Sequence, residues 1–98
     1  MNDEQAKTIV LFRVDNDGVC FAIFPFVDEG RGLVSTFDMN GGHSAGQRGA
    51  MIGASRVARP EEYAAIHRVL TSKPYGYRLA IRTRTPRFDP YRKKNQPK

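Results

Sequence analysis

The chain is poor in the side chains from which most metal centres and disulfide frameworks are built. It has 98 residues, no tryptophan, two histidines and one cysteine, Cys20. A single cysteine excludes an intramolecular disulfide and a thiolate metal cluster. Because Cys20 lies inside an apolar segment, we expect an unreactive core thiol. His43 and His67 show no ligand spacing, which argues against a zinc site. We therefore expect neither a metal nor a cofactor.

Long hydrophobic runs are also missing. The longest apolar stretch is far shorter than the ~20 residues that cross a bilayer. Residues 1–7 are polar and acidic, unlike a secretory signal, so we expect a cytoplasmic protein with no membrane contact. The length indicates one domain. We place this α+β domain at residues 1–85, followed by a disordered, basic, proline-containing tail at residues 86–98.

Acidic side chains are scarce in the second part of the chain. Residues 1–62 hold six basic and nine acidic side chains, whereas residues 63–98 hold ten basic and one acidic. The net charge of +6 therefore comes from the C-terminal part. A chain segment with this excess of positive charge favours anionic partners. Arginine guanidinium groups fit phosphate oxygens, and aromatic rings stack on bases. The candidate nucleic-acid or anion-binding residues are Arg48, Arg68, Arg78, Arg82, Arg84, Arg87, Phe88, Tyr91, Arg92, Lys93 and Lys94. The alternative to nucleic-acid binding is that these charges belong to a solvated strand face and a solubilising tail.

The densest apolar segment, residues 8–26, predicts a β-hairpin. Apolar and β-branched side chains fill residues 8–14 and 19–24, and Asp15-Asn16-Asp17-Gly18 between them supplies turn chemistry. The second run is apolar on both faces, which is typical of a strand buried on both sides. One helix covers only one face. A loop or a second subunit must then cover the other, so a homodimer is one expectation.

Local patterns predict three more elements. Residues 33–38 read as a third strand. A helix begins at Pro60, which suits the first helical position, and ends before Pro74. Its apolar stripe is Tyr63, Ile66, His67 and Leu70. Alternation over residues 77–83 predicts the last strand, with Tyr77, Leu79 and Ile81 facing inward and Arg78, Ala80 and Arg82 facing outward.

These elements assemble into an α+β fold. It is a small, four-stranded, mostly antiparallel sheet with one helix packed on it. A right-handed crossover through the helix places the last strand parallel to the first. The predicted spatial order is third, second, first and fourth strand.

Residues 39–59 show no clear period. Twenty-one residues without an element are long for a compact domain. The segment is either a functional loop or contains a short strand or helical turn near residues 50–52 or 55–57. Its glycine-rich part, residues 41–50, can bring backbone amides to an anion beside Arg48, although it matches neither a P-loop nor a dinucleotide fingerprint. The alternative is a flexible or tightly turned loop.

Three weaker patterns do not support catalysis or metal binding. The Asp15-x-Asp17-Gly18 sequence is similar to the start of a calcium loop, but the twelfth position is Phe26 instead of glutamate. A hydrolytic trio of Asp38, His43 and Ser44 lacks a nucleophile elbow. The two histidines give no zinc spacing. We therefore expect a binding protein that is not an enzyme.

Several short motifs resemble a family of small uncharacterised proteins of bacteria, phages and plasmids. They are V-L-F-R, a glycine turn and F-A-I-F-P, then G-Q-x-G-A at residues 46–50, P-E-E-Y at residues 60–63 and G-Y-x-L at residues 76–79. The resemblance covers most of the predicted domain. Members of that family tend to have histidine at the position of Arg48, which puts the role of that side chain in doubt. The family has no established activity, so the resemblance concerns the fold.

The sequence leads to two hypotheses about function. In the first, the basic C-terminal half contacts nucleic acid or a nucleoprotein. In the second, the protein is an interaction module, such as an inhibitor or accessory factor encoded by a mobile element, and uses a sheet face and residues 39–59 to bind a protein partner.

Overall fold

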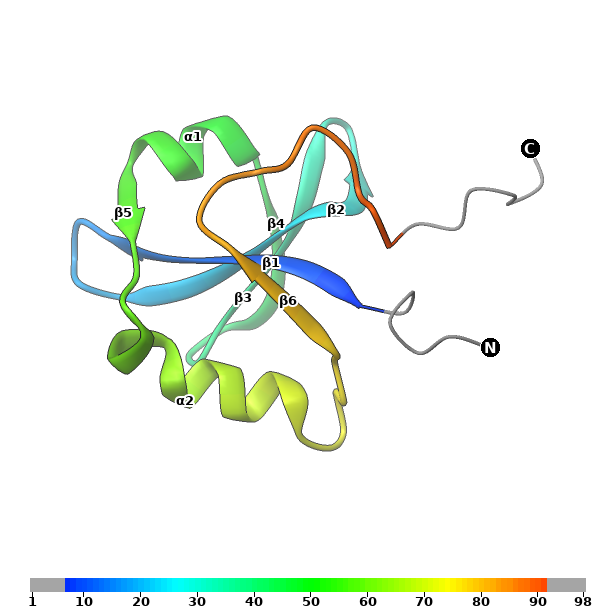
Figure 1. Cartoon of the computed structure of the whole chain (residues 1–98). Coiled ribbons are helices and arrows are strands. Elements are labelled where there is room, and N and C mark those ends of the chain that lie inside the picture. The colour runs from blue at the N-terminus through cyan, green and yellow to red at the C-terminus, as the bar shows by residue number, and fades with distance from the viewer. Residues whose placement is uncertain (1–6, 92–98) are drawn as a thin grey trace.

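Residues 7–91, the part that the computed structural model describes, form one sheet with a helix on each side (Figure 1). The elements in chain order are β1 (Thr8–Asp15), β2 (Cys20–Gly30), β3 (Leu33–Asp38), β4 (Gly42–Gly46), α1 (Arg48–Gly53), β5 (Ser55–Val57), α2 (Pro60–Thr71) and β6 (Leu79–Arg82). Within this part of the chain, neither helix is long and apolar enough to cross a membrane.

The predicted pairings among four of the strands are confirmed. β1 pairs with β2, and β2 with β3, in antiparallel fashion, while β6 pairs with β1 in parallel. The order β3-β2-β1-β6 is the predicted one. The predicted number of elements is too low, because residues 39–59 add β4 outside β3, the short helix α1, and β5 beside β1.

Strand β1 is paired along both of its edges. On one side it meets β2. On the other side, its first half pairs with β6 from Thr8 to Leu11, and its second half pairs with β5 from Arg13 to Asp15. Between these two partners, the N–H of Ala58 donates to the carbonyl oxygen of Phe12 at 2.9 Å. Two short strands thus share the edge that the sequence assigned to the last strand alone.

The main core lies between the sheet and α2. Strand alternation sends every second side chain of β1 and β2 to this side, and the helix contributes the stripe that its 3.6-residue period predicts. Tyr63 stacks on Phe12 with ring centroids 4.3 Å apart, and Ile66 and Leu70 are buried. The buried members are Val10, Phe12, Val14, Ala22, Phe24, Phe37, Ala58, Ile66 and Leu70.

The opposite face of the sheet is also buried, which the two-sided apolar pattern predicted. Ile9, Leu11 and Ile23 are at most 2% exposed in this single chain. Helix α1 and the segment after β6 lie on this side (Figure 1). Ala80, predicted to face outward, is therefore buried. Because the chain covers its second face itself, this burial no longer requires a second subunit.

Arg13 fixes α1 and β5 to the second face of the sheet. Its guanidinium donates to Ser55 Oγ at 2.8 Å, to the Ser55 carbonyl oxygen at 2.7 Å and to the Ile52 carbonyl oxygen at 3.3 Å. The side chain is buried, and this burial lowers its pKa from the ordinary arginine value. A buried cation needs such acceptors, because a charge removed from water without partners is strongly destabilising.

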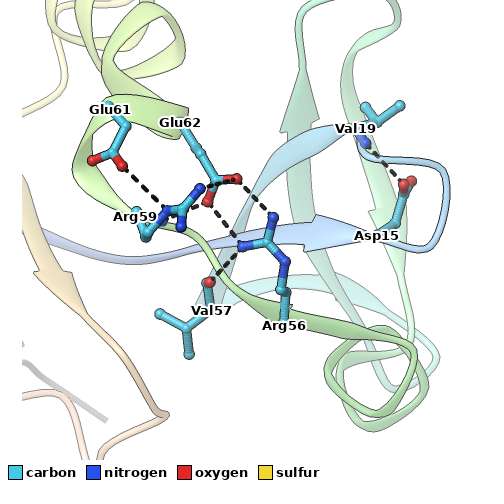
Figure 2. Close-up of polar contacts among 7 residues, drawn as sticks. All are labelled: Asp15, Val19, Arg56, Val57, Arg59, Glu61 and Glu62. Atoms are coloured by element: carbon cyan, nitrogen blue, oxygen red, sulfur yellow. Dashed lines mark hydrogen bonds and ion pairs between the residues drawn. The ribbon is translucent and has the colours of Figure 1, made fainter.

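The hairpin turn is closed by Asp15. Its Oδ1 accepts from the backbone N–H of Asp17 at 2.9 Å. The same oxygen accepts from the backbone N–H of Val19 at 3.0 Å (Figure 2). Gly18 supplies the positive φ of +81° that the turn requires. The aspartate that is similar to the first position of a calcium loop thus serves the local turn.

The start of α2 is organised around Glu62. One carboxylate oxygen accepts from the backbone N–H of Arg59 at 2.8 Å, and the Arg56 guanidinium donates to both oxygens at 2.9 and 2.7 Å (Figure 2). The hydrogen bonds from Arg56, followed by that from the Arg59 backbone, lower the pKa of Glu62 to about 2. Glu62 thereby supplies the cap that the side chain of Arg59 does not.

The lowered pKa of Glu62 predicts an acid-dependent loss of stability. A carboxylate whose folded pKa lies below its ordinary value of 4.5 stabilises the fold above that value, and the contribution disappears as pH falls toward about 2. We expect Glu62→Gln to lower the melting temperature near neutral pH. The difference from the natural protein should shrink steadily between pH 4.5 and 2.

Glu61→Gln is the matched control, because it removes the same charge from the same helical turn without touching Arg56. Its effect should be smaller. Thermal unfolding followed by circular dichroism over this pH range measures both variants. A Glu62→Gln deficit that stays constant down to pH 2 would contradict the role assigned to this carboxylate.

Candidate nucleic-acid interface

The segment after β6 turns back against the sheet. Because Leu11 pairs with Arg82, the two side chains share the face that carries α1. The Arg82 guanidinium donates to the Tyr91 hydroxyl at 3.2 Å, and the Lys7 ammonium lies 5.9 Å from the centroid of the same ring. Tyr91 is half-buried by these contacts. It was predicted as a stacking platform, but the structure uses it to hold the returning chain.

Besides Arg82, whose guanidinium bonds Tyr91, three exposed arginines of the basic half have no acidic partner among the described residues. Within residues 7–91, every ion pair shorter than 4 Å joins Arg56 or Arg59 to Glu61 or Glu62. No described carboxylate therefore pairs with Arg68, Arg84 or Arg87, all of which are exposed. Phe88, beside Arg87, is 67% exposed.

Arg68 lies in an open groove between α2 and β6. This groove, the α2–β6 groove, has a volume of about 510 Å³. Its walls carry two half-buried aromatic side chains, Tyr63 and His67, and the aliphatic Ile81. The lining residues are Pro60, Tyr63, Ala64, His67, Arg68, Thr71 and Ile81, among which Arg68 is the charged one.

The rings in this groove are held from behind by the core. Tyr63 lies nearly parallel to Phe12, with an interplanar angle of 15°, and His67 meets the edge of Phe12 at a centroid distance of 6.4 Å. These side chains were predicted as part of the apolar stripe of the helix, which they are. Their exposed parts also form a surface, and Ile81 of β6 lines it opposite the helix.

Arg48 lies elsewhere, at the first residue of α1. It lines a different groove, of about 500 Å³, together with Pro25, Asp28 and Gly32. The Asp28 carboxylate makes that groove less favourable for an anion. Arg48 was predicted as an anion contact of the glycine-rich segment, apart from the C-terminal cations, and it lies on a surface of its own.

The glycine-rich segment around Arg48 is not a phosphate loop. Residues 42–46 form β4, and the side chain of Gln47 begins α1 by accepting from the N–H of Ala50 at 2.6 Å. Gly46 lies close to α1, because a Cβ there would lie 2.6 Å from the sulfur of Met51 and the flexible Met51 side chain would have to shift. The glycines therefore serve an edge strand and the contact between that strand and α1.

The other predicted contact residues, Arg78, Arg92, Lys93 and Lys94, do not line the α2–β6 groove as the structure describes it. Arg78 precedes β6 and is exposed, but it is not free of interactions; its carbonyl oxygen accepts from the N–H of Thr8 at 2.7 Å. Arg92, Lys93 and Lys94 lie outside the described residues. The predicted tail begins at residue 86, of which residues 86–91 are described, and the boundary at residue 85 stays a prediction.

The hydrolytic trio of Asp38, His43 and Ser44 is not assembled. His43 Nδ1 lies 3.2 Å from the carbonyl oxygen of Thr36, and Nε2 lies 3.3 Å from the Tyr77 hydroxyl. Asp38 instead accepts from backbone N–H groups of the β3–β4 turn, and Ser44 points to the opposite face of β4 from its neighbour His43.

His43 belongs to an aromatic cluster that the sequence did not reveal. Its ring lies 5.1 to 6.0 Å from the ring centroids of Phe24, Phe37, Tyr75 and Tyr77. Burial is the main cause that raises the pKa of the Tyr77 hydroxyl. The cluster lies on the core side of β4. It was not predicted because its members are far apart in the sequence.

The described residues also bear on two other kinds of site, a reactive thiol and a metal centre. Burial, and then the negative charge of Glu62, raise the pKa of the Cys20 thiol, which disfavours the reactive thiolate. Within residues 7–91, no cluster of three or more histidine, cysteine, aspartate or glutamate side chains is arranged to hold a metal ion.

Comparison of the chain with protein-family models, with curated proteins and with solved structures finds no match. The resemblance to small bacterial, phage and plasmid proteins therefore stays a prediction.

Proposed function

We propose that this protein acts by binding nucleic acid, alone or in a nucleoprotein, through its basic C-terminal half. The observation that supports this function best is a set of exposed arginines whose side chains make no ion pair or hydrogen bond with the described residues, Arg68, Arg84 and Arg87. An arginine already paired with a carboxylate must give up that pair to bind a phosphate. These three have no described pair to give up.

The chemistry of this surface is recognition of phosphate and base. A planar guanidinium donates two parallel hydrogen bonds to phosphate oxygens, and each phosphate neutralised in this way releases condensed counterions. Phe88, 67% exposed beside Arg87, offers an aromatic face on which a base can stack. These are groups for binding, so the proposed role is non-catalytic.

The salt dependence of binding tests this proposal. We expect a fluorescein-labelled oligonucleotide to bind at low salt and to dissociate steeply as salt rises, because counterion release drives the association. Arg84→Gln and Arg87→Gln should each lower the slope of log affinity against log salt by about 1. Fluorescence anisotropy over a salt series measures both quantities.

Lys73→Gln is the matched control, because it removes one exposed positive charge at the end of α2 from a residue outside the candidate set. Its slope should stay closer to that of the natural protein. No binding at low salt would contradict the proposed function, and an equal loss in all three variants would assign the binding to net charge alone.

A second function, binding of a protein strand, is supported by the edge strand β4. It pairs with β3 on one side, and no other described strand covers its other edge. Its sequence, Gly42–Gly46, contains no charged residue or proline, and its three central residues are exposed. Natural edge strands usually carry lysine, proline or a bulge that prevents pairing. A neutral, open edge permits addition of a strand from a partner or a second copy.

Pairing of two β4 edges predicts a dimer that one lysine abolishes. Light scattering should give a dimer at micromolar concentration for the natural protein and a monomer for Ser44→Lys, since two lysines would then meet across the paired edges. Asn16→Lys adds the same charge in the exposed β1–β2 turn and should remain dimeric. A monomeric natural protein would contradict self-pairing at this edge.

A further inference from the structure

We infer that the α2–β6 groove takes a base of a single-stranded nucleic acid, which the neighbouring arginines hold by its phosphates. This inference rests on the proposed function and names its substrate class. The groove joins two aromatic side chains, Tyr63 and His67, with one cation, Arg68, and its lining contains no carboxylate. The groove is open to solvent, with a volume of about 510 Å³, so a base that enters it would keep part of its surface exposed.

The aromatic wall is already ordered before a ligand arrives. Tyr63 is stacked on Phe12 at 4.3 Å, and His67 lies 6.4 Å from Phe12 and 6.5 Å from Tyr63. Rings that the core immobilises lose little conformational freedom when a base stacks on them. Stacking on a base is tolerant of sequence, because every base presents a π-face.

The order of residues in and after β6 is compatible with a nucleic-acid strand that crosses this β-strand. Ile81 faces the groove and Arg68, whereas Arg82 faces the other side of the sheet and Arg84 follows two residues later. In the described chain, β6 pairs only with β1, so its outer edge carries no further strand. A flexible single strand can place a base beside Arg68 and continue over this edge to Arg84.

A duplex cannot use this groove in the same way. Its bases are stacked and paired inside the helix, so a duplex presents phosphates and groove edges to a surface. A single strand can splay a base into the groove. Arginine contacts alone would accept both forms, whereas the groove selects the single strand.

The test measures how tightly the natural protein binds four ligands of equal length that carry the same label. They are a deoxythymidine strand, a ribouridine strand, an abasic deoxyribose-phosphate strand and a duplex, and fluorescence anisotropy is read at one low salt concentration. We expect the two strands with bases to bind at least about fivefold more tightly than the abasic strand and the duplex, as stacking of one base provides. The thymidine and uridine arms separate DNA from RNA.

The variant His67→Leu tests the groove itself. Leucine suits the half-buried stripe of α2 and removes the imidazole ring, so the preference for strands with bases should decrease while binding of the abasic strand stays unchanged. Lys73→Gln, measured alongside, should keep the preference. Circular dichroism establishes that each variant is folded.

Each outcome decides between the inference and the function on which it rests. Equal binding of the abasic strand and the thymidine strand, or of the duplex and the thymidine strand, would overturn the groove as a base site and leave nucleic-acid binding intact. If folded His67→Leu keeps the natural preference for strands with bases over the abasic strand, the base stacks outside the α2–β6 groove. Failure of all four ligands to bind would overturn the proposed function as well.

Discussion

Strand β1 must be paired on both edges and covered on both faces, and the rest of the structure follows from this constraint. Val10 and Leu11, on opposite faces, are 0% and 1% exposed. The α2 side requires an amphipathic helix, and the other side requires a second cover, which Arg13 anchors through its bonds to Ile52 and Ser55. The second edge requires partners, which β5 and β6 supply in halves. Strand β2 covers one edge and helix α2 covers one face. Strands β5 and β6 pair with the other edge, and residues 48–53 and 83–91 lie over the other face.

The elements that local patterns specify were predicted from the sequence, and those that depend on distant partners were not. Alternation, the turn at Asp15 and the helical period after Pro60 specify the hairpin and α2 with few long-range contacts. The strand β4 has the sequence Gly-His-Ser-Ala-Gly, which contains no β-branched residue, so its strand comes from pairing with β3. Helix α1 has six residues and none is buried. One signal was present in the sequence: Arg13, a charge in an apolar strand, needed buried acceptors from some other segment.

The candidate surface was predicted in composition but not in shape. The arginines of the basic half are visible in the sequence, and Arg68, Arg84 and Arg87 are exposed without a described acidic partner. Three features depend on how the strands pair. These are which candidate arginines lie on which side of β6, the location of Arg48 on another surface, and the packing of Tyr91 against the chain. The groove could not be predicted because Tyr63 and His67 belong to the helical stripe. The predicted parallel pairing of β6 with β1 places Ile81 opposite them, but no local pattern indicates how much of each ring stays exposed.

The most direct test of this account is a map of amide chemical-shift changes when a short thymidine strand is added to the ¹⁵N-labelled protein. We predict that the largest changes fall on the side of α2 that borders the α2–β6 groove, near His67 and Arg68, and on residues 81–88, while β4 and α1 remain nearly unchanged. Largest changes on residues 42–53, with the surroundings of β6 unaffected, would contradict a nucleic-acid interface built across that strand.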